Sequence, residues 1–140
     1  MYELSKSFRF ETAHRLAKGY EGKCANIHGH SWNGSVTLRT DILDEFSFGI
    51  DYGNIKIFYK DLIDELDHSI LLYRFDTELI DLCKEKGWKY MLFDENPTSE
   101  CIAKYLFEAI KERAYAYDSA IELIDVTIEE TCTSKCVYYD

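Results

Sequence analysis

The sequence lacks the features that mark several large classes of protein. It has one proline and seven glycines among 140 residues, so we find no proline-rich linker, repeat or low-complexity segment. No apolar run approaches the length of a membrane span, and the N-terminal residues alternate polar with apolar side chains, unlike a secretion signal. We therefore expect a single cytoplasmic domain over residues 1–140, with no membrane partner.

Positive charge is also scarce. The chain has 16 lysines and arginines against 26 acidic residues, a formal net charge of −10. This balance argues against nucleic-acid binding and against docking on anionic lipid. An anionic small substrate would need a local cationic patch or a metal ion. Cationic residues near the N-terminal motifs are the candidates for such a patch: Lys6, Arg9, Arg15, Lys18 and Lys23.

Disulfide staples are not expected either. The chain has five cysteines, an odd number, and its N-terminal residues do not resemble an export signal. We therefore expect the thiols to be reduced. Hydrophobic residues make up 46% and charged residues 30%, an ordinary globular balance that provides for an apolar core without such staples.

Alternating side chains predict four β-strands. Residues 2–14 and 28–40 have the period of two that is typical of strands, and residues 120–130 and 136–139 predict two more. One face of the first strand is expected to carry Phe8, Phe10, Thr12 and His14. One face of the second is expected to carry His28, His30, Trp32, Gly34, Val36 and Leu38. One face of the third is expected to carry Ile124, Val126, Ile128 and Glu130.

Helical spacing appears between the two strand pairs. Residues 51–66 carry an apolar stripe, and a second long helix begins near Asn96 and Pro97, residues that suit an N-cap and a first helical position. Weaker patterns suggest a short helix over 76–86 and a short strand over 88–93. We predict an α+β fold in the order ββααββ, a four-stranded antiparallel sheet with two helices on one face. Its two free edges favour pairing with further copies.

Three of the four histidines fall on the predicted inner strand faces. His28 and His30 are two residues apart and point the same way, and a hairpin would bring His14 beside them. Three imidazoles with an open fourth position are the usual ligand set of a catalytic Zn²⁺ site. The alternative is a group of ordinary, partly buried histidines, but convergence of all three favours the metal.

Other residues leave alternatives open. Cys24 is a fourth zinc ligand, a reactive thiolate or an ordinary loop cysteine. Asp67 and His68 suggest a carboxylate that orients an imidazole, although adjacent side chains seldom face each other, so a plain helix end is favoured. Glu130 continues an apolar face, so it is either a solvated strand end or the partner of a ligand with adjacent N–H donors. Thr98 and Ser99 lie in a helix first turn that suits an anion or acceptor but is ordinary by itself.

The motifs together resemble those of the 6-pyruvoyltetrahydropterin synthase family. They stand in the family's order along the whole chain: F-E-T-A-H-R-L at 10–16, C-A-N-I-H-G-H at 24–30, L-D-H at 66–68, N-P-T-S-E at 96–100 and E-T-C-T at 130–133. The resemblance implies the T-fold (tunnelling fold), in which strands of several subunits close a barrel. It implies a homo-oligomer, with a hexamer favoured, and active sites between subunits.

The resemblance also implies roles for individual residues. His14, His28 and His30 would bind Zn²⁺, with Cys24 as catalytic thiol and Asp67 and His68 as its proton-relay partners. Glu130 would hold the amino-pyrimidine edge of the pterin. The ring would be framed by Thr98, Ser99 and Glu100.

The family resemblance narrows the reaction. Three residues separate Cys24 from His28, the spacing of the branch that forms a carboxylated pterin. The implied substrate is 7,8-dihydroneopterin triphosphate, and the implied products are 6-carboxy-5,6,7,8-tetrahydropterin, acetaldehyde and triphosphate, on a route to queuosine or another deazapurine. The alternatives are a pyruvoyl-forming or folate-type pterin lyase and a structural zinc module without activity. The segment 69–95 is longer than in the shortest members of the family, so no role is carried over there, and Trp32 stands where many members have Phe or Tyr.

Overall fold

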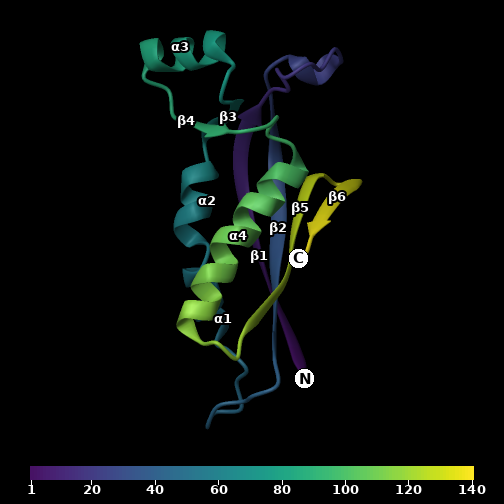
Figure 1. The fold of residues 1–140 in the computed structure, drawn as a ribbon, viewed down its shortest axis with the longest axis vertical. Helices are drawn as coiled ribbons and strands as arrows, with labels where there is room; N and C mark the ends of the chain where they lie inside the picture. The colour runs from purple at the N-terminus through teal and green to yellow at the C-terminus, as the bar shows by residue number, and fades with distance from the viewer.

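Helices cover one face of a curled β-sheet in the computed structural model, which describes residues 1–140 (Figure 1). The elements in chain order are β1 (Tyr2–His14), the 3-10 turn η1 (Lys23–Ala25), β2 (His28–Thr40), α1 (Tyr52–Ile57), α2 (Lys60–Leu66), β3 (Ser69–Tyr73), α3 (Thr77–Lys86), β4 (Tyr90–Phe93), α4 (Ser99–Tyr117), β5 (Glu122–Thr131) and β6 (Ser134–Tyr138). None of the helices combines the length and the apolar character needed to cross a membrane.

The long antiparallel pair of β1 and β2 forms the centre of the sheet. Each strand has 13 residues, and they pair from Tyr2 opposite Thr40 to His14 opposite His28. The predicted alternation is confirmed, because the buried side chains of both strands face the helices. Phe10 and Trp32 are opposite one another, with stacked rings whose centroids lie 5.8 Å apart.

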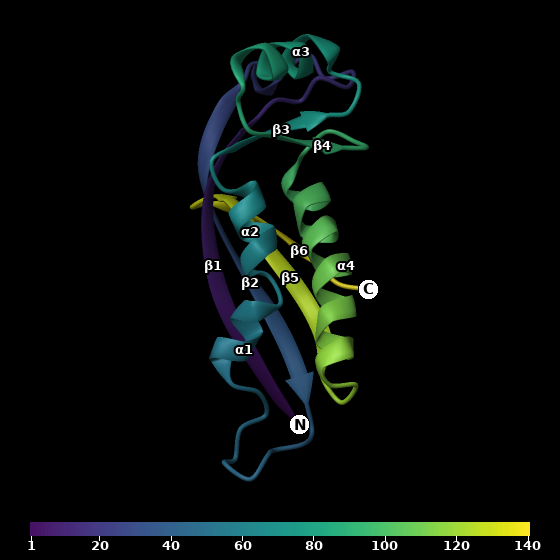
Figure 2. The same ribbon diagram turned by 90° about the vertical axis from the view of Figure 1, so that its left-hand side faces the viewer.

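The helices pack on this apolar face, and Figure 2 shows α2 and α4 to the same side of β1. Helix α4 buries the predicted stripe of Ile102, Ala103, Leu106, Phe107, Ile110 and Ala114. The predicted helix over 51–66 is interrupted between α1 and α2. Phe58 and Tyr59 donate to carbonyls three residues back, which tightens the chain into a turn, and both side chains are buried in the core.

The prediction of a four-stranded antiparallel sheet is wrong in strand number and direction. The sheet has six strands in the order β4-β3-β1-β2-β5-β6, and β3 runs parallel to both β1 and β4. The predicted helix over 76–86 and strand over 88–93 are confirmed as α3 and β4, whereas β3 was not predicted. Its five residues show no alternation because both faces of the strand are covered, so periodicity gives no signal there.

Strand β5 departs from simple alternation at two points. Thr37 pairs with Asp125 and Leu38 with Leu123, so Ile124 is the extra residue of a bulge. Leu123 is therefore buried with Val126 and Ile128, and the predicted place of Ile124 on that face is wrong. A second irregularity between Glu129 and Thr131 surrounds Glu130. Strand β6 begins at Ser134, two residues before the predicted start.

Gly34 lies where no side chain fits. A Cβ atom there would stand 2.5 Å from Cε2 of Phe8 and 2.7 Å from the main-chain oxygen of Thr127. We expect Gly34→Ala to lower the free energy of unfolding by about 1–3 kcal/mol, because the carbonyl can move only with its strand. Gly29→Ala is the matched control, since its nearest neighbour would be 3.6 Å away. Urea unfolding of both variants checks this, and equal midpoints would contradict it.

Candidate metal centre and active site

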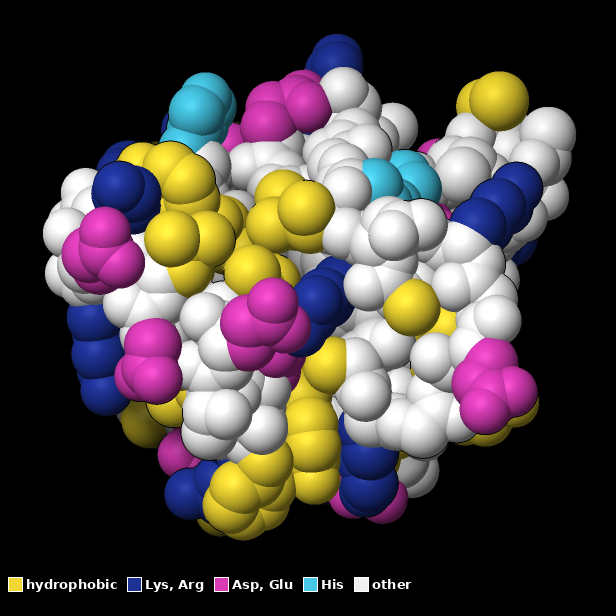
Figure 3. Space-filling view, turned by 90° about the horizontal axis from the view of Figure 1, so that it is seen from above, with side chains coloured by type: hydrophobic (Ala, Val, Ile, Leu, Met, Phe, Trp, Pro, Cys, Tyr) yellow, Lys and Arg dark blue, Asp and Glu magenta, His cyan; other side chains and the backbone are white.

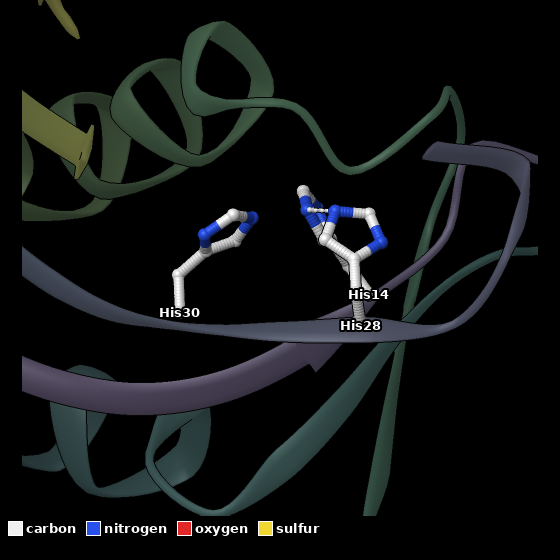
Figure 4. Close-up of side chains that lie close together, drawn as sticks. All are labelled: His14, His28 and His30. Atoms are coloured by element: carbon white, nitrogen blue, oxygen red, sulfur yellow. Dashed lines mark hydrogen bonds between the residues drawn. The ribbon is translucent and has the colours of Figure 1, made fainter. Parts of the chain in front are cut away.

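Strand pairing brings the three predicted histidines together at one end of the sheet. His14 is the last residue of β1, and His28 and His30 begin β2, so all three point to the helix-covered side (Figure 4). One ligand atom from each lies within 4.8 Å of the others. His14 is 2% exposed, while the other two are partly buried. The predicted convergence is confirmed.

Hydrogen bonds to the main chain fix two of these rings. Nδ1 of His14 lies 2.7 Å from the carbonyl oxygen of Pro97, and Nδ1 of His28 lies 2.7 Å from that of Asn26. A carbonyl only accepts, so each Nδ1 carries the proton and each neutral ring keeps its lone pair on Nε2. Metal-bound histidines in proteins are commonly oriented in this way.

The lone pairs then face one another. The Nε2 atoms of His14 and His28 are 3.1 Å apart, and the buried Nε2 of His30 has no hydrogen-bond partner. Two lone pairs that face each other and a buried nitrogen without a hydrogen-bond partner would be stabilised by a cation between the rings. The donor set therefore fits a metal ion, and three imidazole nitrogens are typical of Zn²⁺.

Burial favours the neutral form of His14 and His30. It lowers the pKa of His14, although the bond to the Pro97 carbonyl acts in the opposite direction. Burial also lowers the pKa of His30, against the opposing charge of Glu130. Neutral imidazole is the form that binds metal, so the protein favours this form before any ion arrives.

Glu130 lies beside the three histidines. The irregularity in β5 places its Oε1 atom 3.5 Å from Nε2 of His30, and its side chain is 31% exposed. It is therefore neither a freely solvated strand end nor a buried charge. The carboxylate has one side toward the histidines and is accessible from solvent.

The start of α4 borders the same place. Thr98 accepts a hydrogen bond from the amide of Cys101 and caps the helix, while Ser99 donates to Glu100 over 3.3 Å. A hydrogen bond from Thr98 lowers the pKa of Glu100, so this carboxyl is an anion at neutral pH. The Pro97 carbonyl bonds to His14, so the predicted residues 98–100 come directly after a residue that contacts the candidate metal centre.

Asp67 and His68 contact each other, contrary to the expectation for adjacent residues. His68 has a left-handed backbone with φ of 55°, which brings its Nδ1 2.8 Å from Oδ2 of Asp67. The amide of Glu11 donates to the other carboxylate oxygen and lowers the pKa of Asp67. A carboxylate that orients an exposed imidazole is thus present.

This pair does not join the three histidines. Asp67 and His68 are bonded to the main chain of Glu11, and the His68 ring is 78% exposed. On the end of the molecule drawn in Figure 3, histidine side chains accordingly appear at two separate places. The chain therefore carries two separate groups, the three histidines and the Asp67–His68 pair.

Cys24 lies in η1, on the loop that joins β1 to β2. It is a half-buried free thiol, and its main-chain oxygen accepts a hydrogen bond of 2.9 Å from the amide of Leu16. The group of converging ligand atoms comprises the three histidines and no cysteine. The loop thus brings the thiol to the same end of the sheet without adding it to that group.

The predicted cationic patch is largely neutralised by partners. Arg9 pairs with a glutamate, Arg15 with the buried Asp76 and Lys18 with Glu95, and Lys6 stands over the ring of Tyr52. Lys6 and Lys23 have no ion-pair partner, and of the two only Lys23 is next to Cys24. The sequence could not show this, because the partners come from distant segments.

Two contributors to the site were not predicted at all. They are the carbonyl groups of Asn26 and Pro97, which orient the rings. Every residue has a carbonyl group, so no residue type signals such a role. The only hint for Pro97 was its place in the N-P-T-S-E motif.

Comparisons with known proteins agree with this geometry. Residues 3–140 match the family described as 6-pyruvoyl tetrahydropterin synthase. A 6-carboxy-5,6,7,8-tetrahydropterin synthase of Aquifex aeolicus is 33% identical, over 98% of this chain and 97% of its own. One of Synechocystis sp. is also 33% identical, over 99% and 94%. The structure of the Caenorhabditis elegans 6-pyruvoyl tetrahydropterin synthase superimposes with a TM-score of 0.73 at 27% identity, over 99% of this chain and 95% of that one.

Removal of one ring tests the metal centre. We expect His30→Ala to lower zinc affinity by more than about 100-fold, because loss of a ligand exceeds the cost of losing an outer partner. Cys24→Ala should keep one zinc per chain if the thiol is not a ligand. Metal analysis after competition with a chelator measures both. Zinc loss in Cys24→Ala, or a thiolate charge-transfer band in the Co²⁺ form, would show a fourth protein ligand instead.

Proposed function

The chain belongs to the 6-pyruvoyl tetrahydropterin synthase family, and from this premise we propose that it is a zinc-dependent lyase that makes 6-carboxy-5,6,7,8-tetrahydropterin. The substrate is 7,8-dihydroneopterin triphosphate, which with water gives this pterin, acetaldehyde and triphosphate. The observation that carries the proposal is the convergence of three histidines, each with one ligand atom within 4.8 Å of the others. The two relatives at 33% identity bear the name of this activity.

The three histidines would hold Zn²⁺ and leave a coordination position open. When bound, the ion supplies Lewis-acid chemistry toward oxygen atoms of the substrate side chain. The chain's own contribution is to favour the neutral form of His14 and His30 by burial, and to orient the rings of His14 and His28 through Pro97 and Asn26.

Two carboxylates suit the pterin ring. Glu130 presents an acceptor for the adjacent N–H groups of an amino-pyrimidine, and paired bonds from one carboxylate give both affinity and orientation. Thr98, Ser99 and Glu100 frame the ring from the helix start. Glu130 lies 3.5 Å from His30, so a pterin bound there is held beside the metal position.

Cys24 is proposed to move a proton. Its loop is pinned between His14 and His28, and its sulfur stands outside the group of metal ligands, which leaves the thiol available to act as a base toward a C–H of the substrate side chain. Lys23 beside it has no ion-pair partner, and its positive charge suits the triphosphate.

Asp67 and His68 would return a proton in the site of a neighbouring copy. The carboxylate holds Nδ1 of His68 and leaves Nε2 directed outward. Because this pair stands apart from the histidines of its own chain, a complete site requires a second copy. We propose a homo-oligomer, with a hexamer favoured, whose active sites lie between subunits.

The first test of the proposed function is to identify the reaction product. Zinc-loaded protein incubated with 7,8-dihydroneopterin triphosphate should release acetaldehyde and a pterin with the mass of the carboxylated product. We expect Cys24→Ala to retain zinc and lose at least about 100-fold in kcat, the usual range for loss of a general base. Cys132→Ala, at an exposed cysteine in the β5–β6 turn, is the control. A pyruvoyl or hydroxymethyl pterin would assign another reaction of the family, and full activity of Cys24→Ala would remove its role.

Mixed oligomers test the shared site. Cys24→Ala and His68→Ala chains, co-expressed with different tags and purified through both, should regain roughly a quarter of wild-type activity, because random pairing rejoins intact halves at that frequency. The control is the double variant in one chain, co-expressed with an inactive Cys24→Ala partner, which cannot rebuild a site. Absence of any recovery in verified mixed oligomers would show that each chain uses its own pair.

A further inference from the structure

Asn96 and Pro97 contact two different parts of the proposed active site from consecutive positions. The Pro97 carbonyl holds His14. The Asn96 carboxamide makes two hydrogen bonds to the main chain of Lys18: Oδ1 accepts from its N–H over 2.8 Å, and Nδ2 donates to its C=O over 3.1 Å. Lys18 belongs to the loop that carries Cys24.

These contacts are the loop's main attachment to the rest of the protein. Within residues 16–25, the other hydrogen bonds are internal, such as the one from the Leu16 amide to the Cys24 carbonyl, or come from the adjacent Asn26 to the Lys23 carbonyl. Only Lys18 forms hydrogen bonds to a distant segment, through Asn96 and through an ion pair of its side chain with Glu95. Without Asn96, the loop's main chain is held only where β1 ends and β2 begins.

Asn96 is itself well fixed. It is followed by the buried Pro97, whose ring restricts the backbone, and its carbonyl accepts a hydrogen bond of 2.8 Å from Thr98. Thr98 caps α4, whose next turn includes the fully buried Ile102. A rigid helix start therefore determines where Lys18 lies.

We propose that Asn96 is a positioning residue, which sets the Cys24 loop at a fixed place relative to the metal ligand His14. The inference rests on the proposed function, in which Cys24 must meet a substrate bound beside the metal. Two bonds from one planar amide fix both position and direction of the Lys18 main chain. A misplacement of the thiol by about 1 Å costs on the order of 100-fold in rate.

The test compares substitutions at neighbouring positions. Asn96→Ala removes both bonds to Lys18. Asn96→Asp keeps the acceptor for the Lys18 amide and turns the donor into a second acceptor that faces a carbonyl. Glu95→Gln weakens the ion pair with the Lys18 side chain and leaves the main-chain bonds in place, so it serves as the control.

We expect Asn96→Ala to lose about 10- to 100-fold in kcat while KM changes by less than about threefold and zinc content stays at one per chain. Asn96→Asp should lie between Asn96→Ala and wild type, and Glu95→Gln should match wild type. Hydrogen exchange at the Leu16 amide gives a reading independent of turnover. Its partner Cys24 is intact in every variant, so exchange at least about fivefold faster in Asn96→Ala alone would report a released loop.

Unchanged kcat in Asn96→Ala, or an equal loss in Glu95→Gln, would overturn the positioning role. So would loss of zinc from Asn96→Ala, which would place the effect on His14 instead of the loop. A wild-type protein that binds zinc and converts no pterin would overturn the proposed function, and the exchange comparison would then still decide whether Asn96 places the loop.

Discussion

The register of β1 against β2 is the constraint on which the rest of the structure depends. Thirteen residues pair without interruption, and His14 meets His28 at the end of the ladder. Side chains alternate between faces, so a slip of one residue would turn the histidines of one strand away from those of the other. The apolar side chains hold the register, because the same slip would expose Phe10 or Trp32 to water. Core packing and metal geometry are therefore specified by one set of hydrogen bonds.

The three converging histidines occupy the polar end of an apolar layer. The ring centroids of His14 and His30 each lie 5.2 Å from that of Trp32, edge to face, so a core side chain packs against both imidazoles. Such burial favours neutral rings and opposes protonation, which is the electrostatic condition that a metal site needs. The main-chain carbonyls of Asn26 and Pro97 complete the arrangement. Each of these carbonyl groups lies close in the chain to a proposed functional residue. A movement of either segment would therefore displace a histidine and that functional residue together.

The β3–α3–β4 unit attaches to the same end of the molecule. Arg15, next to His14, forms a bidentate pair with the buried Asp76, and Thr12 donates to the Ser69 carbonyl over 2.5 Å. The turn that leads from α2 into this unit is the one in which Asp67 accepts a hydrogen bond from the Glu11 amide. One stretch of β1 thus presents the candidate metal ligand His14 on one face and supports a carboxylate–imidazole pair at its edge. The separation of these two groups is the reason for proposing an active site shared between copies of the chain.

The sequence by itself determined the α+β class, the inner faces of β1 and β2, the stripe of α4 and the identity of the three converging histidines. Strand and helix periods are local, so the sequence alone predicts them. An H-x-H pair on a strand needs only one further histidine, on the neighbouring strand, to form a cluster of three. Its motifs also determined the family.

Tertiary structure alone decided that the sheet is mixed and has six strands, since β3 is buried on both faces and shows no period. It decided that Leu123, not Ile124, enters the core, because a bulge depends on the partner strand. It also decided that Asp67 and His68 meet through a left-handed backbone, that Glu130 turns toward His30, and that most nearby cations are already paired. These features arise from contacts between residues distant in the chain, and a contact of that kind leaves no periodicity or spacing in the sequence to be read.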